Sequence, residues 1–171
     1  MTSLVALCVS IGVLGGVATY LALGPLQGLI LIWGIFIGWA TFFATGGSSS
    51  SLQKSIACNV FGVICAWIMA IILLSTPLGG WGAVGAGIAV GLTVLGMCLA
   101  AHIKLLDAIP ASVYGYAAGA AYLLQTEGAL DMSALTGANF GNVLVIISVS
   151  LIVGALFGLL SGKVGEMLTK G

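Results

Sequence analysis

The chain has 171 residues, of which 61% are hydrophobic and only 5% are charged, and its formal net charge is zero. A soluble domain carries about 25% charged residues, so the polar side chains here are too few to cover a water-soluble particle. The composition therefore predicts an integral membrane protein and excludes the basic surface that a nucleic-acid partner requires.

Apolar runs occupy almost the whole chain. Crossing roughly 30 Å of hydrocarbon takes about 20 residues, and glycines and prolines such as Gly24-Pro25 and Gly46-Gly47 separate runs of that length. We predict one all-α transmembrane domain over residues 1–171, with no room for a soluble domain. The predicted spans are Leu4–Leu23, Leu26–Ala44, Ser55–Leu74, Ala83–Ala101, Ala108–Leu124 and Phe140–Ser161.

The lysines predict how the chain is oriented. With six spans, both termini fall on one side, together with the loops that hold Lys54 and Lys104 and the tail that holds Lys163 and Lys170. The opposite loops carry acidic residues and no basic one. By the positive-inside rule, both termini are expected in the cytoplasm.

Four cysteines fall inside the predicted spans, without C-x-x-C spacing and without a nearby histidine. We interpret them as small apolar packing residues. The sequence also shows no nucleophile with a partner base, no phosphate-binding glycine loop and no acidic pair within a span. We therefore expect no enzymatic activity, no cofactor and no metal site.

The two halves of the chain share three patterns in the same order: a glycine pair, a glycine-aromatic-alanine segment and an asparagine-valine pair. This order predicts a duplication, with repeat 1 over about residues 4–74 and repeat 2 over about 83–161. Because three spans is an odd number, the second copy would cross in the opposite sense, an inverted 3+3 repeat typical of transporters and channels. The matched sets are Gly12/Gly16 with Gly87/Gly91, Gly38-Trp39-Ala40 with Gly115-Tyr116-Ala117, and Asn59-Val60 with Asn142-Val143.

Asn59 and Asn142 are the first candidates to line a pathway, because each is expected about one turn into its helix. Their amides donate and accept hydrogen bonds without a charge, which suits a neutral or weakly charged solute. The alternative is that each amide bonds a neighbouring helix.

Aromatic residues give a second set of candidates. In the fifth span, Ser112 and Tyr116 share a helical stripe with two glycines, which could form a groove for a small molecule or could simply pack tightly. Trp39 corresponds to Tyr116 in the first half. Phe36 and Phe43 share one face and could form an apolar constriction, or could instead face lipid.

Polar segments follow the second span and the fifth. The first could be a flexible loop with serine caps, or could offer hydroxyls and helix N–H groups to an anion at a pathway mouth. The second would build the opposite mouth. The mouth candidates are Ser48, Ser49, Ser50, Ser51, Gln53 and Gln125.

The chain resembles a family of small six-helix bacterial inner-membrane proteins classed as a domain of unknown function. The residues that carry this likeness are the 38–44 segment Gly-Trp-Ala-Thr-Phe-Phe-Ala closing on Gly46-Gly47, Trp67, and the 109–115 segment Ile-Pro-Ala-Ser-Val-Tyr-Gly. The serine run after Gly47 and a longer loop between the fifth and sixth spans depart from the pattern. The resemblance implies a fold and a bacterial inner-membrane location, and it implies no functional residues.

These features predict a facilitative channel or uniporter for a small neutral or weakly charged solute of the urea, amide or ammonia class. Alternatives are a small monovalent-anion channel, an ion-coupled secondary transporter, and a non-transporting scaffold or regulatory subunit. The expected partners are the lipid bilayer, the solute and further copies of the chain, because small-residue faces favour close helix contact.

Overall fold

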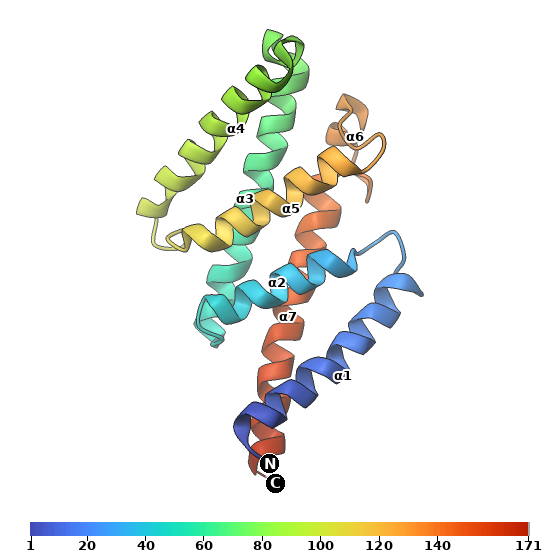
Figure 1. Ribbon diagram of the computed structural model, residues 1–171, viewed down its shortest axis with the longest axis vertical. Helices are drawn as coiled ribbons and strands as arrows, with labels where there is room; N and C mark the ends of the chain where they lie inside the picture. Colours follow the sequence, from blue (N-terminus) through green and yellow to red (C-terminus); the bar gives the residue numbers. More distant parts are fainter. Residues whose placement is uncertain (171) are drawn as a thin grey trace. The chain divides into compact units, whose positions relative to one another are not determined.

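The computed structural model describes residues 1–170, and in this part of the chain every named element is a helix (Figure 1). The elements in chain order are α1 (Ser3–Leu23), α2 (Ile32–Ala44), α3 (Ser49–Ser75), the 3-10 helix η1 (Pro77–Trp81), α4 (Gly82–Leu99), the 3-10 helix η2 (Ala100–His102), α5 (Ile109–Gln125), α6 (Met132–Thr136) and α7 (Val143–Lys170).

Four stretches are long and apolar enough to cross a membrane: Ser3–Leu23, Ser49–Ser75, Pro77–His102 and Val143–Thr169. They make the chain an all-α membrane protein. Helix α2 is apolar but has only 13 residues, which gives a length of about 20 Å at 1.5 Å per residue. This is shorter than the hydrocarbon core of roughly 30 Å, so the number of spans stays a prediction.

The chain divides into two compact units. Unit 1 comprises Met1–Ile56 together with the residues from Val149 onward, and unit 2 comprises Ala57–Ser148. Unit 1 therefore holds α1, α2 and most of α7, whereas unit 2 holds α4, α5, α6 and most of α3 (Figure 1).

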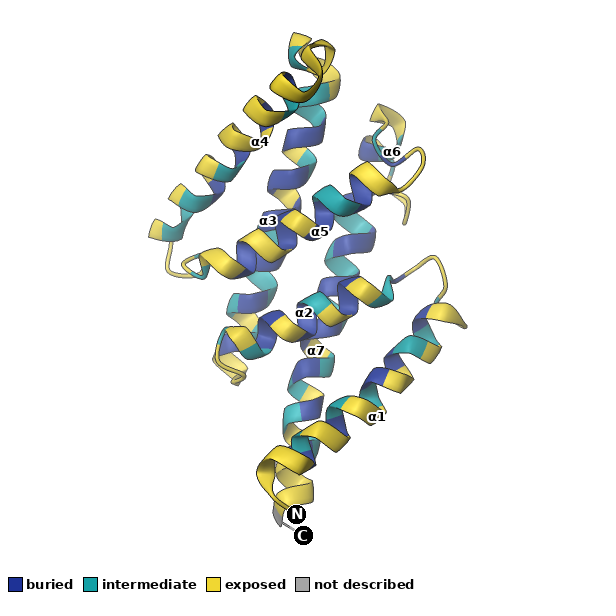
Figure 2. Cartoon of the chain, in the orientation of Figure 1, coloured by how far each residue is buried: buried dark blue, intermediate teal, exposed yellow. Residues whose placement is uncertain are grey.

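Each unit has its own buried apolar cluster. In unit 1 the cluster gathers around Trp39 and includes Ala18 and Ile35. In unit 2 it gathers around Tyr116 and includes Ala66. Figure 2 shows the burial along α3 and α7, whereas α4 is exposed over most of its outer surface, as a lipid-facing helix would be.

Local hydrogen bonds explain why α2 and α3 begin at other residues than predicted. Helix α3 begins at Ser49, six residues before the predicted Ser55, since the Ser48 hydroxyl accepts a bond from the Ser51 N–H at 3.2 Å and caps the helix. Helix α2 begins at Ile32 and not at Leu26, because the Leu26 carbonyl accepts turn bonds from Leu29 and Ile30.

The short helix α6 has no counterpart among the predicted elements. Its N-cap is Asp131, whose Oδ1 accepts hydrogen bonds from the Ser133 N–H at 2.8 Å and the Ser133 hydroxyl at 2.5 Å. These bonds favour the carboxylate and lower the pKa of Asp131. At five residues, α6 is too short for hydrophobic periodicity to reveal it.

Candidate functional site

In unit 2, α3 and α5 cross with their backbones in contact. A Cβ added to Gly115 would overlap the carbonyl oxygen of Asn59, and one added to Gly62 would overlap the carbonyl oxygen of Ser112. Glycine is required at both positions because the backbones of α3 and α5 approach too closely there for a Cβ atom. The crossing places Asn59 on α3 beside the stripe of α5 that holds Ser112.

Asn59 and Ser112 are buried at this crossing without hydrogen-bond partners for their side chains. Asn59 is 0% exposed and Ser112 is 2% exposed, and no described group bonds Asn59 Nδ2, Asn59 Oδ1 or Ser112 Oγ. Leaving a buried polar group unsatisfied costs about 1–3 kcal/mol. The crossing thus holds an amide donor, an amide acceptor and a hydroxyl for which the described residues supply no hydrogen-bond partner.

Tyr116 lies on α5, as Ser112 does, but the Tyr116 hydroxyl has a hydrogen-bond partner. The Tyr116 hydroxyl and the Thr93 hydroxyl of α4 are 2.9 Å apart, and Thr93 also donates to the Ala89 carbonyl. This bond joins α5 to α4. Of the two interpretations of Tyr116, the contact favours packing with a sideways hydrogen bond over an open groove.

In unit 1, α2 and α7 make a similar crossing. A Cβ on Gly38 would overlap the Leu151 carbonyl oxygen, and one on Gly154 would overlap the Ile35 carbonyl oxygen. Trp39 is 3% exposed, and its Nε1 donates to Ser161 Oγ at 3.0 Å. Trp39 thus binds α2 to α7.

The rings of Phe36 and Phe43 have different surroundings. Phe36 is 45% exposed and stacks on Trp39, with ring centroids 6.0 Å apart. Phe43 packs against the edge of Phe42 and lines a cavity at the end of α2. These contacts give no support to a shared constriction.

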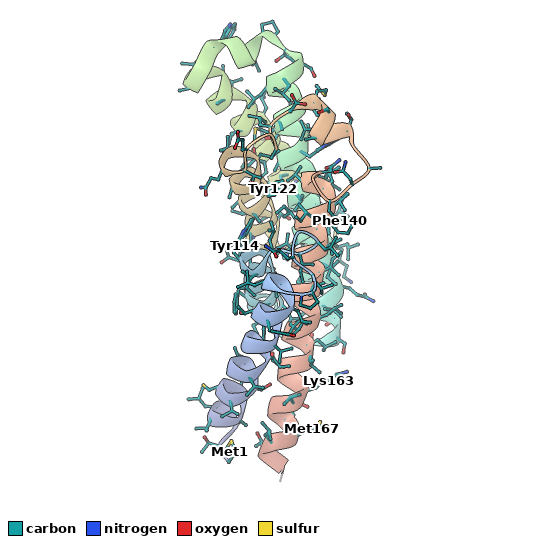
Figure 3. The ribbon with its side chains drawn as sticks, turned by 90° about the vertical axis from the view of Figure 1, so that its right-hand side faces the viewer. Met1, Tyr114, Tyr122, Phe140, Lys163 and Met167 are labelled. Carbon is teal, nitrogen blue, oxygen red and sulfur yellow. The ribbon has the colours of Figure 1, made fainter. Side chains whose placement is uncertain are left out.

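Asn142 lies just before α7, and not one turn into a helix as predicted. Its Oδ1 accepts a bond from the Leu144 N–H, and its Nδ2 donates to the carbonyl oxygens of Leu135 and Gly137, each at 2.9 Å. It therefore caps α7 and ties α6 to it. In Figure 3 the labelled Phe140 marks the segment just before the start of α7. The environments of Asn59 and Asn142 are not equivalent.

The serine run is the ordered start of α3. The Ser48 hydroxyl lies 2.9 Å from the Ser50 hydroxyl and 2.8 Å from the Ser51 hydroxyl, and Ser51 donates to the Thr45 carbonyl at 2.8 Å. These hydroxyls satisfy one another and the preceding turn, which leaves fewer of them for an anion. The remaining mouth candidates, Ser49, Gln53 and Gln125, are exposed.

One site was not found from the sequence. Unit 1 contains a cavity of about 310 Å³ where the start of α1, the turn after α2 and the end of α7 meet. Glu166 is the one charged residue that lines it. Its walls come from three distant segments, so only the Gly46-Gly47 pair signals it in the sequence.

Comparison with known proteins agrees with the resemblance seen in the sequence. The chain matches the family DUF1097, described as a protein of unknown function, over residues 8–166. No curated protein and no solved structure matches it. The match covers nearly the whole chain, and on that basis the chain belongs to the DUF1097 family.

Proposed function

We propose that the chain is a facilitative channel or uniporter for a small neutral or weakly charged polar solute of the urea, amide or ammonia class. The observation that carries the proposal is the pair of buried, unpartnered side chains at the α3–α5 crossing, Asn59 and Ser112. A polar group in a membrane helix is costly unless it has a partner or faces water or solute.

The chemistry of these groups suggests the solute class. Urea and simple amides carry N–H donors and a carbonyl acceptor, and these complement the oxygen and the nitrogen of the Asn59 amide. The Ser112 hydroxyl can donate or accept and so completes the set. None of the three groups is charged, so a neutral solute binds without a counter-ion.

The internal contacts of the two units support a duplication. The α2–α7 crossing uses Gly38 and Gly154, and the α3–α5 crossing uses Gly115 and Gly62. Gly38 and Gly115 are 77 residues apart, as are Trp39 and Tyr116, and Gly62 and Gly154 are 92 apart. The same two offsets also relate Ile35 to Ser112 and Leu151 to Asn59, the residues whose carbonyls meet these glycines.

Further pairs follow the same offsets. A Cβ on Gly158 would meet Phe42, and one on Gly119 would meet Ala66, which matches residue 42 with 119 and residue 66 with 158. The Leu31 N–H donates to Ser150 Oγ, and Cys58, which lies 92 residues before Ser150, donates to the Leu105 carbonyl. Leu31 and Leu105 are 74 residues apart, so this pair of contacts follows only the second offset. These contacts support a 3+3 repeat of α1-α2-α3 and α4-α5-α7, inverted if each helix crosses the membrane.

This alignment changes one match made from the sequence. The counterpart of Asn59 is Leu151 and not Asn142, because Asn59 meets Gly115 as Leu151 meets Gly38. The polar site therefore belongs to unit 2 alone. The repeat supplies the two crossings, and Asn59 distinguishes one from the other.

We also propose a bacterial cytoplasmic membrane location with both termini in the cytoplasm, six spans and no enzymatic activity. Lys54 follows the start of α3, and Lys163 lies near the end of α7. Both helix ends belong to unit 1 together with the start of α1. In Figure 3, Met1 lies at the same end as Lys163 and Met167. A basic end of this kind favours the cytoplasmic side.

A homo-oligomer is part of the proposal. The glycine pairs Gly12/Gly16 on α1 and Gly87/Gly91 on α4 have open space where a Cβ would be, with nothing within 4 Å. They are therefore not used for packing within the chain. Paired small residues let membrane helices from two copies approach closely.

Transport is tested with purified protein in proteoliposomes by stopped-flow light scattering across urea, formamide, acetamide and ammonia. We expect the permeability to at least one of these solutes to exceed that of protein-free liposomes. Equal permeabilities for every solute would refute the proposal.

The same vesicles separate the alternatives. An ion-coupled transporter would show uptake that depends on a proton or sodium gradient, and an anion channel would show anion flux that falls when Ser48 to Ser51 become alanine. A scaffold or regulatory subunit would co-purify with a stoichiometric partner and show no flux.

A further inference from the structure

The cavity in unit 1 lies apart from the α3–α5 crossing and has a different chemistry. Ser3 and Leu7 of α1, Phe43 of α2, Gly46 and Gly47 of the following turn, and the end of α7 line its volume of about 310 Å³. That volume is at the lower end of the range for small-molecule sites, about 300–1,000 Å³.

Four glycines line this space. Gly46 and Gly47 have φ values of +116° and +65°, which side chains of L-residues rarely adopt. Gly162 of α7 also lines the cavity, and a Cβ added to it would meet nothing within 4 Å, so the space beside it is open. The chain therefore keeps four small residues, Gly165 included, around one opening.

The polar groups of the cavity favour a cation. Glu166 is exposed and is the one charged side chain in the lining, and no residue within the described part of the chain forms an ion pair with it. The Ser3 hydroxyl adds an acceptor, whereas the Thr169 hydroxyl donates to the Gly165 carbonyl at 2.9 Å. With a carboxylate and no lysine or arginine in the lining, the cavity repels anions.

Phe43 narrows the class of cation. Its ring lines the same cavity as the carboxylate, and the face of an aromatic ring attracts an alkylated ammonium within about 6 Å. A carboxylate, an aromatic ring and apolar walls such as Leu7 suit an ammonium with a short carbon chain better than a hydrated metal ion, which needs several oxygen ligands.

We propose that this cavity binds a small organic ammonium ion, with its charge on Glu166 and its carbon atoms against Phe43. The same chemistry is present in a free amine of the cytoplasm and in the ethanolamine headgroup of a lipid. The test of this site is independent of the proposed transport function, because ligand binding is measured without any measurement of solute flux.

Binding is tested by isothermal titration calorimetry on the full chain in nanodiscs of phosphatidylglycerol, with ethanolamine and choline as probes. Ethylene glycol and acetate are the neutral and anionic comparison ligands. We expect the ammonium probes to bind, and Glu166→Gln to weaken them about tenfold or more through loss of a charge-assisted contact. Glu127→Gln, which removes the same charge from an exposed loop of unit 2, should leave the affinity unchanged.

A second variant tests the cavity itself. Gly162→Leu fills the open space beside the residue and favours the helix, so it should abolish binding while the protein stays folded, as judged by its circular dichroism. In nanodiscs that contain phosphatidylethanolamine, a headgroup site would show a lower apparent affinity for ethanolamine. A site for the free amine would bind ethanolamine with the same apparent affinity in both kinds of nanodisc.

The proposal is overturned by wild-type protein that binds neither ammonium probe, by equal affinity of the wild type and Glu166→Gln, or by acetate binding as tightly as ethanolamine. A Gly162→Leu variant that binds as the wild type does would place any ammonium site elsewhere.

Discussion

Two asparagines show how strongly the local surroundings decide what a polar side chain does. Asn142 uses its whole amide to cap α7 and to hold α6. The side chain of Asn59 is fully buried in α3 and has no hydrogen-bond partner among the described residues. The first amide stabilises the fold, whereas the second costs free energy that only a ligand or water would recover.

Asp131 gives a prediction at this scale. Its hydrogen bonds with Ser133 lower the pKa of the Asp131 carboxyl. The stability that the carboxylate adds to α6 is therefore fully present above the unfolded carboxyl pKa of about 3.9. This stability is lost as the pH falls through the lower pKa of the folded state. Hydrogen exchange of the 131–136 segment should speed up below about pH 4 relative to the rest of unit 2.

Asp131→Asn is the matched control for this effect. An asparagine caps a helix about as well as an aspartate but does not titrate, so the exchange of the same segment should not depend on pH through the cap. A segment that responds to acid equally in both proteins would contradict the role given to the carboxylate.

The residue scale was only partly predictable from the sequence. Asn59 and Ser112 stood out as polar residues within apolar helices, but the burial of both side chains without a hydrogen-bond partner follows from the crossing of α3 with α5. The position of Asn142 was missed because α7 begins at Val143 and not at Phe140. Glu166 was not singled out, because residues from three distant segments complete its cavity.

At the scale of helices, glycines determine where pairs of elements cross. A Cβ on Gly115 would overlap the Asn59 carbonyl, whereas a Cβ on Gly96 of α4 meets nothing within 4 Å. Gly115→Ala should therefore lower the free energy of unfolding by about 2–3 kcal/mol through overpacking. Gly96→Ala should raise it by roughly 0.5–1 kcal/mol through helix propensity.

Both changes are measured by denaturant unfolding in the same detergent, with circular dichroism as the probe. The two variants make the same chemical change, so their difference isolates the crossing. If Gly115→Ala is as stable as Gly96→Ala, then α3 and α5 do not approach as described.

Most helices could be predicted because glycines and prolines interrupt the apolar runs. The bounds of α1, α4 and α5 lie within two residues of the predicted spans. The start of α3 was missed because the serines form a cap and a first turn, and the end of α7 because polar residues such as Lys163 continue the helix beyond Ser161. Hydropathy identifies the apolar part of a helix, whereas α3 and α7 continue into polar residues beyond that part.

At the scale of the whole molecule, the open glycine pairs predict how copies associate. Gly87→Leu should weaken the oligomer about tenfold or more, because a large side chain keeps the facing helices apart. The space beside Gly87 is open within the chain, so the monomer should stay folded. Light scattering coupled to size-exclusion chromatography measures the mass.

Gly96→Leu is the control, since Gly96 also has open space on α4 but lies off the stripe of Gly87 and Gly91. It should keep the mass of the wild type. A Gly87→Leu protein with an unchanged oligomer would remove α4 from the interface, and an unfolded one would place the glycine inside the monomer.

The central claim is that solute passes the buried amide at the α3–α5 crossing, and Asn59→Leu tests it most directly. Leucine is the residue found at the matching position of the other crossing, Leu151, and the change removes a buried polar group that has no partner. We expect urea flux in proteoliposomes to fall to the protein-free background, while the melting temperature stays the same or rises. Unchanged flux, or a marked loss of stability that shows the amide to be bonded in the fold, would contradict the account.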